Sequence, residues 1–145
     1  MKLQCTWNEK MKFTAQAAGN SAEMDAKSPI GSGSAMTPKE LVVAGICGCT
    51  AMDVVALMKK YKQPLDSFDI DADVTASEGV HPAVFTQVHL LFKLTGQVDA
   101  SKVLEAVHLS QTKFCGVSAM LSKAVPISYT VELNGKNIGE GQAAF

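Results

Sequence analysis

Residues 41–58 form an apolar run that constrains the fold more than any other feature of the sequence. Only Thr50 and Asp53 interrupt these eighteen residues, and glycine, alanine and cysteine are frequent among them. A bilayer-spanning helix needs about 20 predominantly apolar residues, and a carboxylate in the middle of such a span is costly. We therefore expect a buried helix of a soluble protein and no membrane association.

Local signals define both ends of this helix. Thr37 is a favourable N-cap residue, Pro38 suits the first helical position, and Glu40 stands where a capping box requires an acid. We expect the helix to run from there to about Lys60. Pro64 lies in the segment that ends it.

The predicted central helix is apolar on every side instead of along one stripe, so other parts of the protein must cover it all round. A domain of 145 residues would strain to enclose such a helix alone. An intertwined homodimer is the simplest way to complete the cover, and a well-wrapped monomer is the alternative.

The rest of the chain predicts strands and shorter helices. Alternating patterns favour strands at residues 3–7, 11–15, 22–26, 68–74, 85–94 and 127–133, and helices are expected after Asp99 and over 116–124. The strands at 68–74 and 85–94 flank a turn and should pair antiparallel. A turn at Asn134-Gly135 should precede a weakly structured tail. This order predicts a single α+β domain over residues 1–145 with an antiparallel sheet around a long buried central helix.

Charge and the N-terminus narrow the function classes. Thirteen basic and fourteen acidic side chains give a net charge of −1, which offers no basic field for nucleic acid. All thirteen basic residues are lysines, so the chain has no arginine to grip a carboxylate or phosphate with two hydrogen bonds. Residues 1–7 lack an apolar signal core, which predicts a cytoplasmic location.

Four cysteines without a signal sequence favour thiols over a secreted disulfide framework. Cys47 and Cys49 are two residues apart on the predicted helix, so they point to nearly opposite sides and cannot line one site. No structural zinc or other cofactor is expected, because no second cysteine-rich knuckle exists. On pattern alone each of the two is more often a small core residue than a nucleophile.

Cys115 lies where one predicted helix ends and another begins. Free amides at a helix N-terminus favour a thiolate there, while the alternative is a buried boundary residue. His108 lies seven residues earlier and either tunes this thiol or is simply solvated. Asp53 lies one turn after Cys49 and needs a partner if it is buried. Gly135, Gly139 and Gly141 do not match a nucleotide-binding fingerprint and are interpreted as turn residues.

Two segments together carry a resemblance to a known family. Residues 37–55, with Gly48-Cys49-Thr50-Ala51-Met52-Asp53-Val54-Val55 inside them, resemble the central-helix motif of the OsmC/Ohr superfamily, and in particular its YhfA-like branch. Cys49 corresponds to the reactive cysteine of that family. Residues 115–118 are similar to the motif that contains the second cysteine of the family's pair.

The resemblance implies an OsmC-like fold in which two subunits interlock as a homodimer. It also implies a thiol peroxidase that reduces organic hydroperoxides without a cofactor. Cys49 would become a sulfenic acid, Cys115 would condense with it to a disulfide, and a cellular dithiol would reduce that disulfide. The alternative is a non-peroxidatic protein that binds a small apolar or electrophilic ligand at the dimer interface, with its thiols as redox sensors.

The resemblance also identifies groups that could act on the thiol. The family's reductases have a glutamate ten residues before the reactive cysteine, where this chain has Lys39, with Glu40 next to it. They also use an arginine from the N-terminal region, which this chain lacks. Lys39, Lys12 or Lys10 could supply positive charge as a point charge rather than a planar fork. The predicted site therefore comprises Cys49, Cys115, Lys39 and Glu40.

Overall fold

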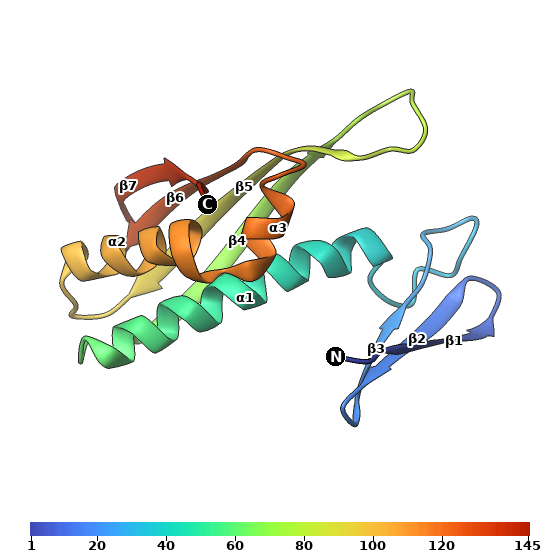
Figure 1. Ribbon diagram of the computed structural model, residues 1–145, viewed down its shortest axis with the longest axis horizontal. Helices are drawn as coiled ribbons and strands as arrows, with labels where there is room; N and C mark the ends of the chain where they lie inside the picture. The colour runs from blue at the N-terminus through green and yellow to red at the C-terminus, as the bar shows by residue number, and fades with distance from the viewer. The chain divides into compact units, whose positions relative to one another are not determined.

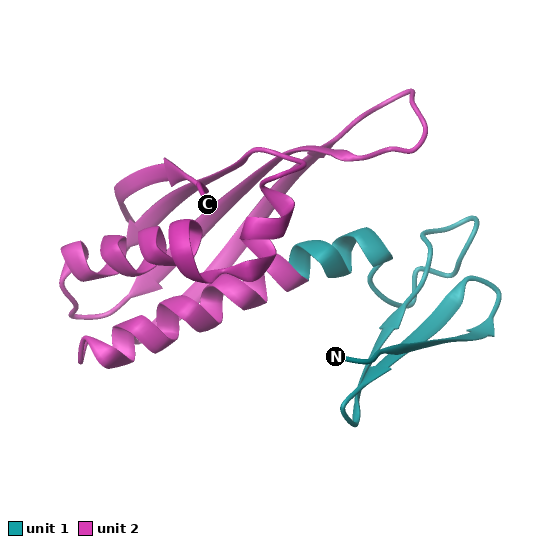
Figure 2. Cartoon of the chain, viewed as in Figure 1, with its two compact units in different colours: residues 1–44 teal, residues 45–145 magenta.

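The computed structural model describes residues 1–145 and divides into two compact units, residues 1–44 and 45–145 (Figures 1 and 2). The elements run in the order β1 (Gln4–Glu9), β2 (Lys12–Ala17), β3 (Asn20–Met24), α1 (Pro38–Lys60), β4 (Ser67–Ala76), β5 (Phe85–Thr95), α2 (Ala100–Leu109), the π-helical turn η1 (Ser110–Phe114), α3 (Gly116–Leu121), β6 (Ile127–Leu133) and β7 (Lys136–Gln142). The predicted α+β class is confirmed.

The first unit contains an antiparallel sheet in the order β1-β2-β3, as the alternation at the start of the sequence predicts. The loop after β3 is organised by Asp25, whose side chain is buried and which sequence reasoning missed. Its carboxylate accepts hydrogen bonds from the backbone N–H of Ala26 and from the N–H and hydroxyl groups of Ser32 and Ser34. These donors hold the pKa of Asp25 well below its usual range. The loop is thus organised around the Asp25 carboxylate.

The second unit contains a four-stranded sheet in the order β4-β5-β6-β7. The antiparallel pairing of β4 with β5 is confirmed. The pairing of β6 with β7 is antiparallel as well, whereas β5 and β6 are parallel, which the sequence does not predict. The helical segment from α2 to α3 connects these two strands. Such a crossover lets β6 run in the same direction as β5, as a parallel pair requires.

The expected weakly structured tail is strand β7, which pairs antiparallel with β6. Asn134 and Gly135 form the predicted turn, and both have positive φ, as a tight hairpin turn requires. Glycine weakens a strand pattern, but here it is needed for packing. A Cβ on Gly139 would lie 2.6 Å from Leu104 Cδ2, and one on Gly141 would lie 2.5 Å from Tyr129 Oη.

The core of the second unit lies between the sheet and the helices. Alternate residues of β5 and β6 are buried, among them Leu90, Phe92 and Val131, and they share one cluster with buried residues of α1 and α2. Asp99 caps α2 as predicted, by accepting a hydrogen bond from the N–H of Ser101. Buried residues of α1 and α2 pack in this core, and the candidate site lies between α1 and the segment that follows α2.

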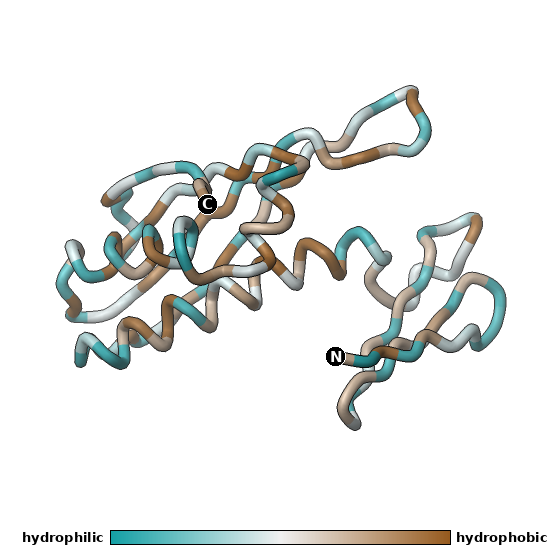
Figure 3. Tube along the Cα trace, viewed as in Figure 1, coloured by the Kyte–Doolittle hydropathy of each residue, from teal (hydrophilic) through white to brown (hydrophobic).

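Helix α1 buries only one stripe of its surface in the single chain. Its buried residues are Ile46, Thr50, Val54 and Met58, spaced four apart on one face. Hydrophobic residues nevertheless recur along its whole length (Figure 3), and Met52 is 75% exposed. By length and composition alone the helix could cross a membrane, but its buried stripe packs in the protein core.

Candidate active site

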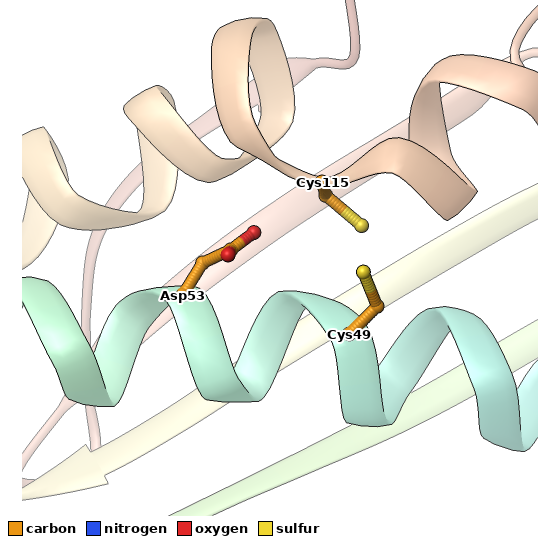
Figure 4. Close-up of side chains that lie close together, drawn as sticks. All are labelled: Cys49, Asp53 and Cys115. Atoms are coloured by element: carbon orange, nitrogen blue, oxygen red, sulfur yellow. The ribbon is translucent and has the colours of Figure 1, made fainter.

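Cys49 and Cys115 face each other from opposite sides of one small cluster (Figure 4). Cys49 projects from the middle of α1, and Cys115 lies at the junction between η1 and α3. The two sulfur atoms and a carboxylate oxygen of Asp53 all lie within 4.8 Å of one another. The structure therefore brings together two residues that are 66 positions apart in the sequence.

The other two cysteines lie elsewhere. Cys47 packs against the hydrophobic core, and burial, with a smaller contribution from Asp71, raises the pKa of its thiol. Cys5 is exposed on β1 in the first unit. The helical-geometry argument that Cys47 and Cys49 cannot share a site is confirmed, because Cys47 packs on the core while Cys49 meets Cys115.

Cys115 has a structural role. Its side chain is fully buried, and its sulfur caps α3 by accepting hydrogen bonds from the N–H of Ser118 at 3.3 Å and from the Ser118 hydroxyl at 3.1 Å. Burial raises the pKa of the Cys115 thiol, and the Ser118 donors offset this only in part. This burial agrees with the interpretation of Cys115 as a buried boundary residue.

A directional chain of hydrogen bonds ends on Asp53. Ser110 Oγ donates to Asp53 Oδ2 at 3.0 Å, so its only proton is used there. Thr50 must then be the donor in its 2.7 Å contact with Ser110, and it accepts in turn from Gln111 Nε2 at 2.7 Å. The chain thus runs from Gln111 through Thr50 and Ser110 to the carboxylate, which lies beside both sulfurs.

The hydrogen-bond chain begins at Gln111, whose side-chain oxygen is unsatisfied. Gln111 is fully buried, and its Oε1 has no hydrogen-bond partner. The π-helical turn η1 supplies both Gln111 and Ser110, and such turns are frequent at functional sites. This turn also interrupts the spacing between His108 and Cys115, so they do not share one helical face. His108 is exposed, which agrees with the solvated interpretation.

Glu40 and Lys39 lie in the first turn of α1, within the first unit. Glu40 completes the predicted capping box, because its Oε2 accepts from the N–H of Thr37 at 2.7 Å and its own N–H donates to Thr37 Oγ1 at 3.3 Å. Its Oε1 pairs with Lys27 Nζ at 2.8 Å. The Lys27 partner and the Thr37 donors lower the pKa of Glu40 to about 2. A role for Lys39 or Glu40 in the thiol chemistry stays a prediction.

Sequence reasoning missed three members of the polar chain, Thr50, Ser110 and Gln111. The available signal was weak: Thr50 interrupts an apolar run, and Ser110 and Gln111 follow an amphipathic helix that ends without a glycine. Asp53 was singled out as a carboxylate in need of a partner, and the structure supplies Ser110.

Comparisons with known proteins concern the family and the fold. A family model described as OsmC-like protein matches residues 31–130. Protein YhfA of Escherichia coli strain K12 is 34% identical over 136 residues, which cover 92% of this chain and 98% of that protein. The structure of an OsmC-like protein from Mycoplasma pneumoniae superposes with a TM-score of 0.80 at 13% identity, covering 91% of this chain and 95% of that one.

A second solved structure carries a more specific description. It is an organic hydroperoxide resistance protein OsmC from Legionella pneumophila, with a TM-score of 0.68 at 18% identity, covering 90% of this chain and 95% of that one. At these identities the two solved structures establish the fold, which is the one that the resemblance implies.

Proposed function

This chain belongs to the OsmC-like protein family, and on that premise we propose that it reduces organic hydroperoxides through Cys49 and Cys115. The observation that carries the proposal is the approach of the two sulfurs to within 4.8 Å of each other (Figure 4). The apolar residues along α1, the helix that carries Cys49, suit an organic hydroperoxide better than hydrogen peroxide. The description of the Legionella pneumophila protein as an organic hydroperoxide resistance protein adds support.

Burial assigns the order of attack. Cys49 is partly accessible, whereas Cys115 is fully buried, so a hydroperoxide would reach Cys49 first. The Cys49 thiolate attacks the distal oxygen of the hydroperoxide, the O–O bond breaks, and the leaving alkoxide takes a proton from solvent to become the alcohol. Cys49 is thereby oxidised to a sulfenic acid.

Cys115 then resolves the sulfenic acid. Its sulfur attacks the Cys49 sulfur, the S–O bond breaks, and water leaves as the disulfide forms. The Asp53 carboxylate, which lies in the same cluster, takes the Cys115 proton and passes it to the leaving hydroxide, which thereby departs as water. The thiol pair supplies two electrons in all, and the peroxide receives them. A cellular dithiol restores the thiols by exchange.

The proposed protein is an intertwined homodimer. The outer face of α1 carries apolar or small side chains that the single chain leaves uncovered, among them Gly45, Met52 and Ala56. A partner helix would bury this face and complete the surroundings of the thiols.

A lysine takes the part of the missing arginine in this proposal, and Lys39 is the first candidate. Lys39→Met keeps the side-chain length and removes the charge, so alkylation of Cys49 by iodoacetamide near neutral pH should slow. Lys136→Met, at the start of β7, is the matched control and should leave the rate unchanged. If Lys39→Met, Lys12→Met and Lys10→Met all alkylate at the wild-type rate, no lysine activates the thiol.

The direct experiment follows cumene hydroperoxide and free thiols together. We expect the reduced protein to consume hydroperoxide with turnover when a dithiol is present, and Cys49→Ser to abolish this consumption. Cys115→Ser should form a sulfenic acid that dimedone traps, without a disulfide. Cys47→Ser is the control and should behave as the wild type. Consumption by the wild type that is no faster than by Cys49→Ser would refute the proposal.

A second candidate function is the binding of a small apolar ligand. Two observations favour it: the chain has no arginine, and an apolar hollow beside α1 is lined by Ala51, Met52, Val55, Ala56, Lys59 and Phe68. In that case an apolar fluorescent dye should bind in the hollow, and Met52→Glu should remove the binding while leaving thiol reactivity unchanged. Hydroperoxide would not be consumed.

A further inference from the structure

We propose that the reduced protein binds a thiophilic divalent cation of the Zn²⁺ class through Cys49, Cys115 and Asp53. The two sulfurs and one carboxylate oxygen lie within 4.8 Å of one another (Figure 4). Thiolate sulfur and carboxylate oxygen are both common zinc ligands. This ligand set differs from the Cys47-Cys49 pair, which helix geometry excludes.

The backbone presents the three ligands from two sides. Cys49 and Asp53 are four residues apart on α1, so both project from one face of the helix. Cys115 approaches from the junction between η1 and α3. In a tetrahedral site with Zn–S bonds of about 2.3 Å, the two sulfurs would lie roughly 3.8 Å apart. A separation within 4.8 Å therefore leaves only a small contraction for side-chain rotation.

Hydrogen bonds already orient two of the three ligands. Ser110 donates to Asp53 Oδ2 at 3.0 Å, at the end of the chain that starts at Gln111. The N–H and hydroxyl of Ser118 donate to the Cys115 sulfur at 3.3 and 3.1 Å. Donors of this kind are what metal ligands require from their surroundings, because they fix orientation and stabilise the deprotonated ligand.

Access and coordination number fit an open site. Cys49 and Asp53 are only partly buried, whereas Cys115 is fully buried, so an ion can enter from the side of α1. Three protein ligands leave the fourth tetrahedral position for water. Binding displaces the protons of the two thiols into solvent. A disulfide between Cys49 and Cys115 removes both thiolates, so the metal-bound and disulfide states exclude each other.

The test uses Co²⁺ as a spectroscopic probe and Zn²⁺ as a competitor, on the full chain reduced anaerobically with a phosphine. We expect one Co²⁺ per chain, with a thiolate-to-metal charge-transfer band that Zn²⁺ abolishes. Cys49→Ser and Cys115→Ser should lose the band, and Cys47→Ser, the matched control on the same helix, should retain it. Ser110→Ala, which keeps all three ligands, should weaken affinity by about tenfold. Oxidation of the pair with diamide should release the metal.

Several outcomes would overturn the proposal. No charge-transfer band at stoichiometric Co²⁺, or a band that survives Cys49→Ser, would exclude the site. If Asp53→Asn binds Zn²⁺ with unchanged affinity, the site has only the two thiols as ligands and the carboxylate is not a ligand. If Asp53→Asn fails to fold in a thermal unfolding control, Asp53→Glu replaces it and should shift the d–d bands of bound Co²⁺. Because no readout involves hydroperoxide, failure here leaves the proposed reductase function untouched, and failure of that function leaves this site untouched.

Discussion

The hydrogen-bond chain behind the cysteine pair makes an energetic prediction that depends on its direction. Thr50→Val removes the acceptor of the buried Gln111 amide and keeps the shape of the side chain. Ser110 still has Asp53 as its acceptor, so one buried donor is left unsatisfied. The variant should lower the free energy of unfolding by about 1 to 3 kcal/mol.

Gln111→Met should behave in the opposite way. It removes the amide together with the Oε1 that has no partner, while Thr50 keeps its bond to Ser110. Losing one hydrogen bond costs about 1 kcal/mol, and removing an unsatisfied buried oxygen recovers about 1 to 3 kcal/mol. We therefore expect Gln111→Met to be neutral or up to about 2 kcal/mol more stable than the wild type.

A double-mutant cycle between Thr50 and Gln111 tests whether this hydrogen-bond chain exists. In the Gln111→Met background, Thr50→Val no longer strands an amide, so its cost should fall and the two changes should couple by about 1 kcal/mol. Urea unfolding of the reduced protein measures all four corners. Thr112→Val, whose hydroxyl bonds to the His108 carbonyl at the surface, is the control and should change stability by less than about 0.5 kcal/mol. Additive costs, or a Gln111→Met variant as unstable as Thr50→Val, would refute the assigned direction.

Three further predictions address the interface, the sheet and the helix cap. A Cβ on Gly45 would meet no atom outside its own helical backbone within 4 Å, so Gly45→Leu should change the unfolding of an isolated chain little. A dimer overpacked by about 1 to 3 kcal/mol should dissociate more readily in analytical ultracentrifugation, and a wild-type monomer would contradict the dimer. Gly141→Ala should destabilise the protein by about 1 to 3 kcal/mol in urea, because its Cβ would lie 2.5 Å from Tyr129 Oη and 2.6 Å from Tyr129 Cζ. Tyr129→Leu removes both atoms and should therefore reduce the cost of Gly141→Ala, and an equal cost in the two backgrounds would contradict the clash. The pKa of Glu40 is lowered from 4.5 to about 2, so its contribution to stability is fully present above pH 4.5 and is lost as the pH falls towards 2. The thermal unfolding temperature of Glu40→Gln should therefore vary less with pH over this window than that of the wild type. The same pH profile in both proteins would exclude the Glu40 cap as the cause.

Local signals made much of the fold predictable. The start of α1 follows from Thr37, Pro38 and Glu40, and the structure confirms the helix from Pro38 to Lys60. The opposite orientation of Cys47 and Cys49 also follows from helix geometry alone. Each of these features depends on residues within a few turns of one another, so no knowledge of distant partners is needed.

The features that sequence reasoning missed all depend on distant residues. Parallel pairing of β5 with β6 depends on how the intervening helices return the chain. Strand β7 was missed because its glycines weaken the strand pattern, and their purpose is visible only once Leu104 and Tyr129 lie against them. The polar chain joins α1 to a turn about sixty residues later, and no spacing rule connects them.

The sulfur of Cys115 caps α3 and also faces Cys49, so the fold and the proposed thiol chemistry make separate demands on one atom. Serine is a strong N-cap residue and can accept the same N–H bond from position 118. Cys115→Ser therefore preserves the requirement of the fold and removes only the sulfur chemistry. A lineage released from that chemistry could drift to serine at this position with little loss of stability, whereas drift to alanine would sacrifice the helix cap as well. The identity of residue 115 in a relative thus reports whether its thiol chemistry is still under selection.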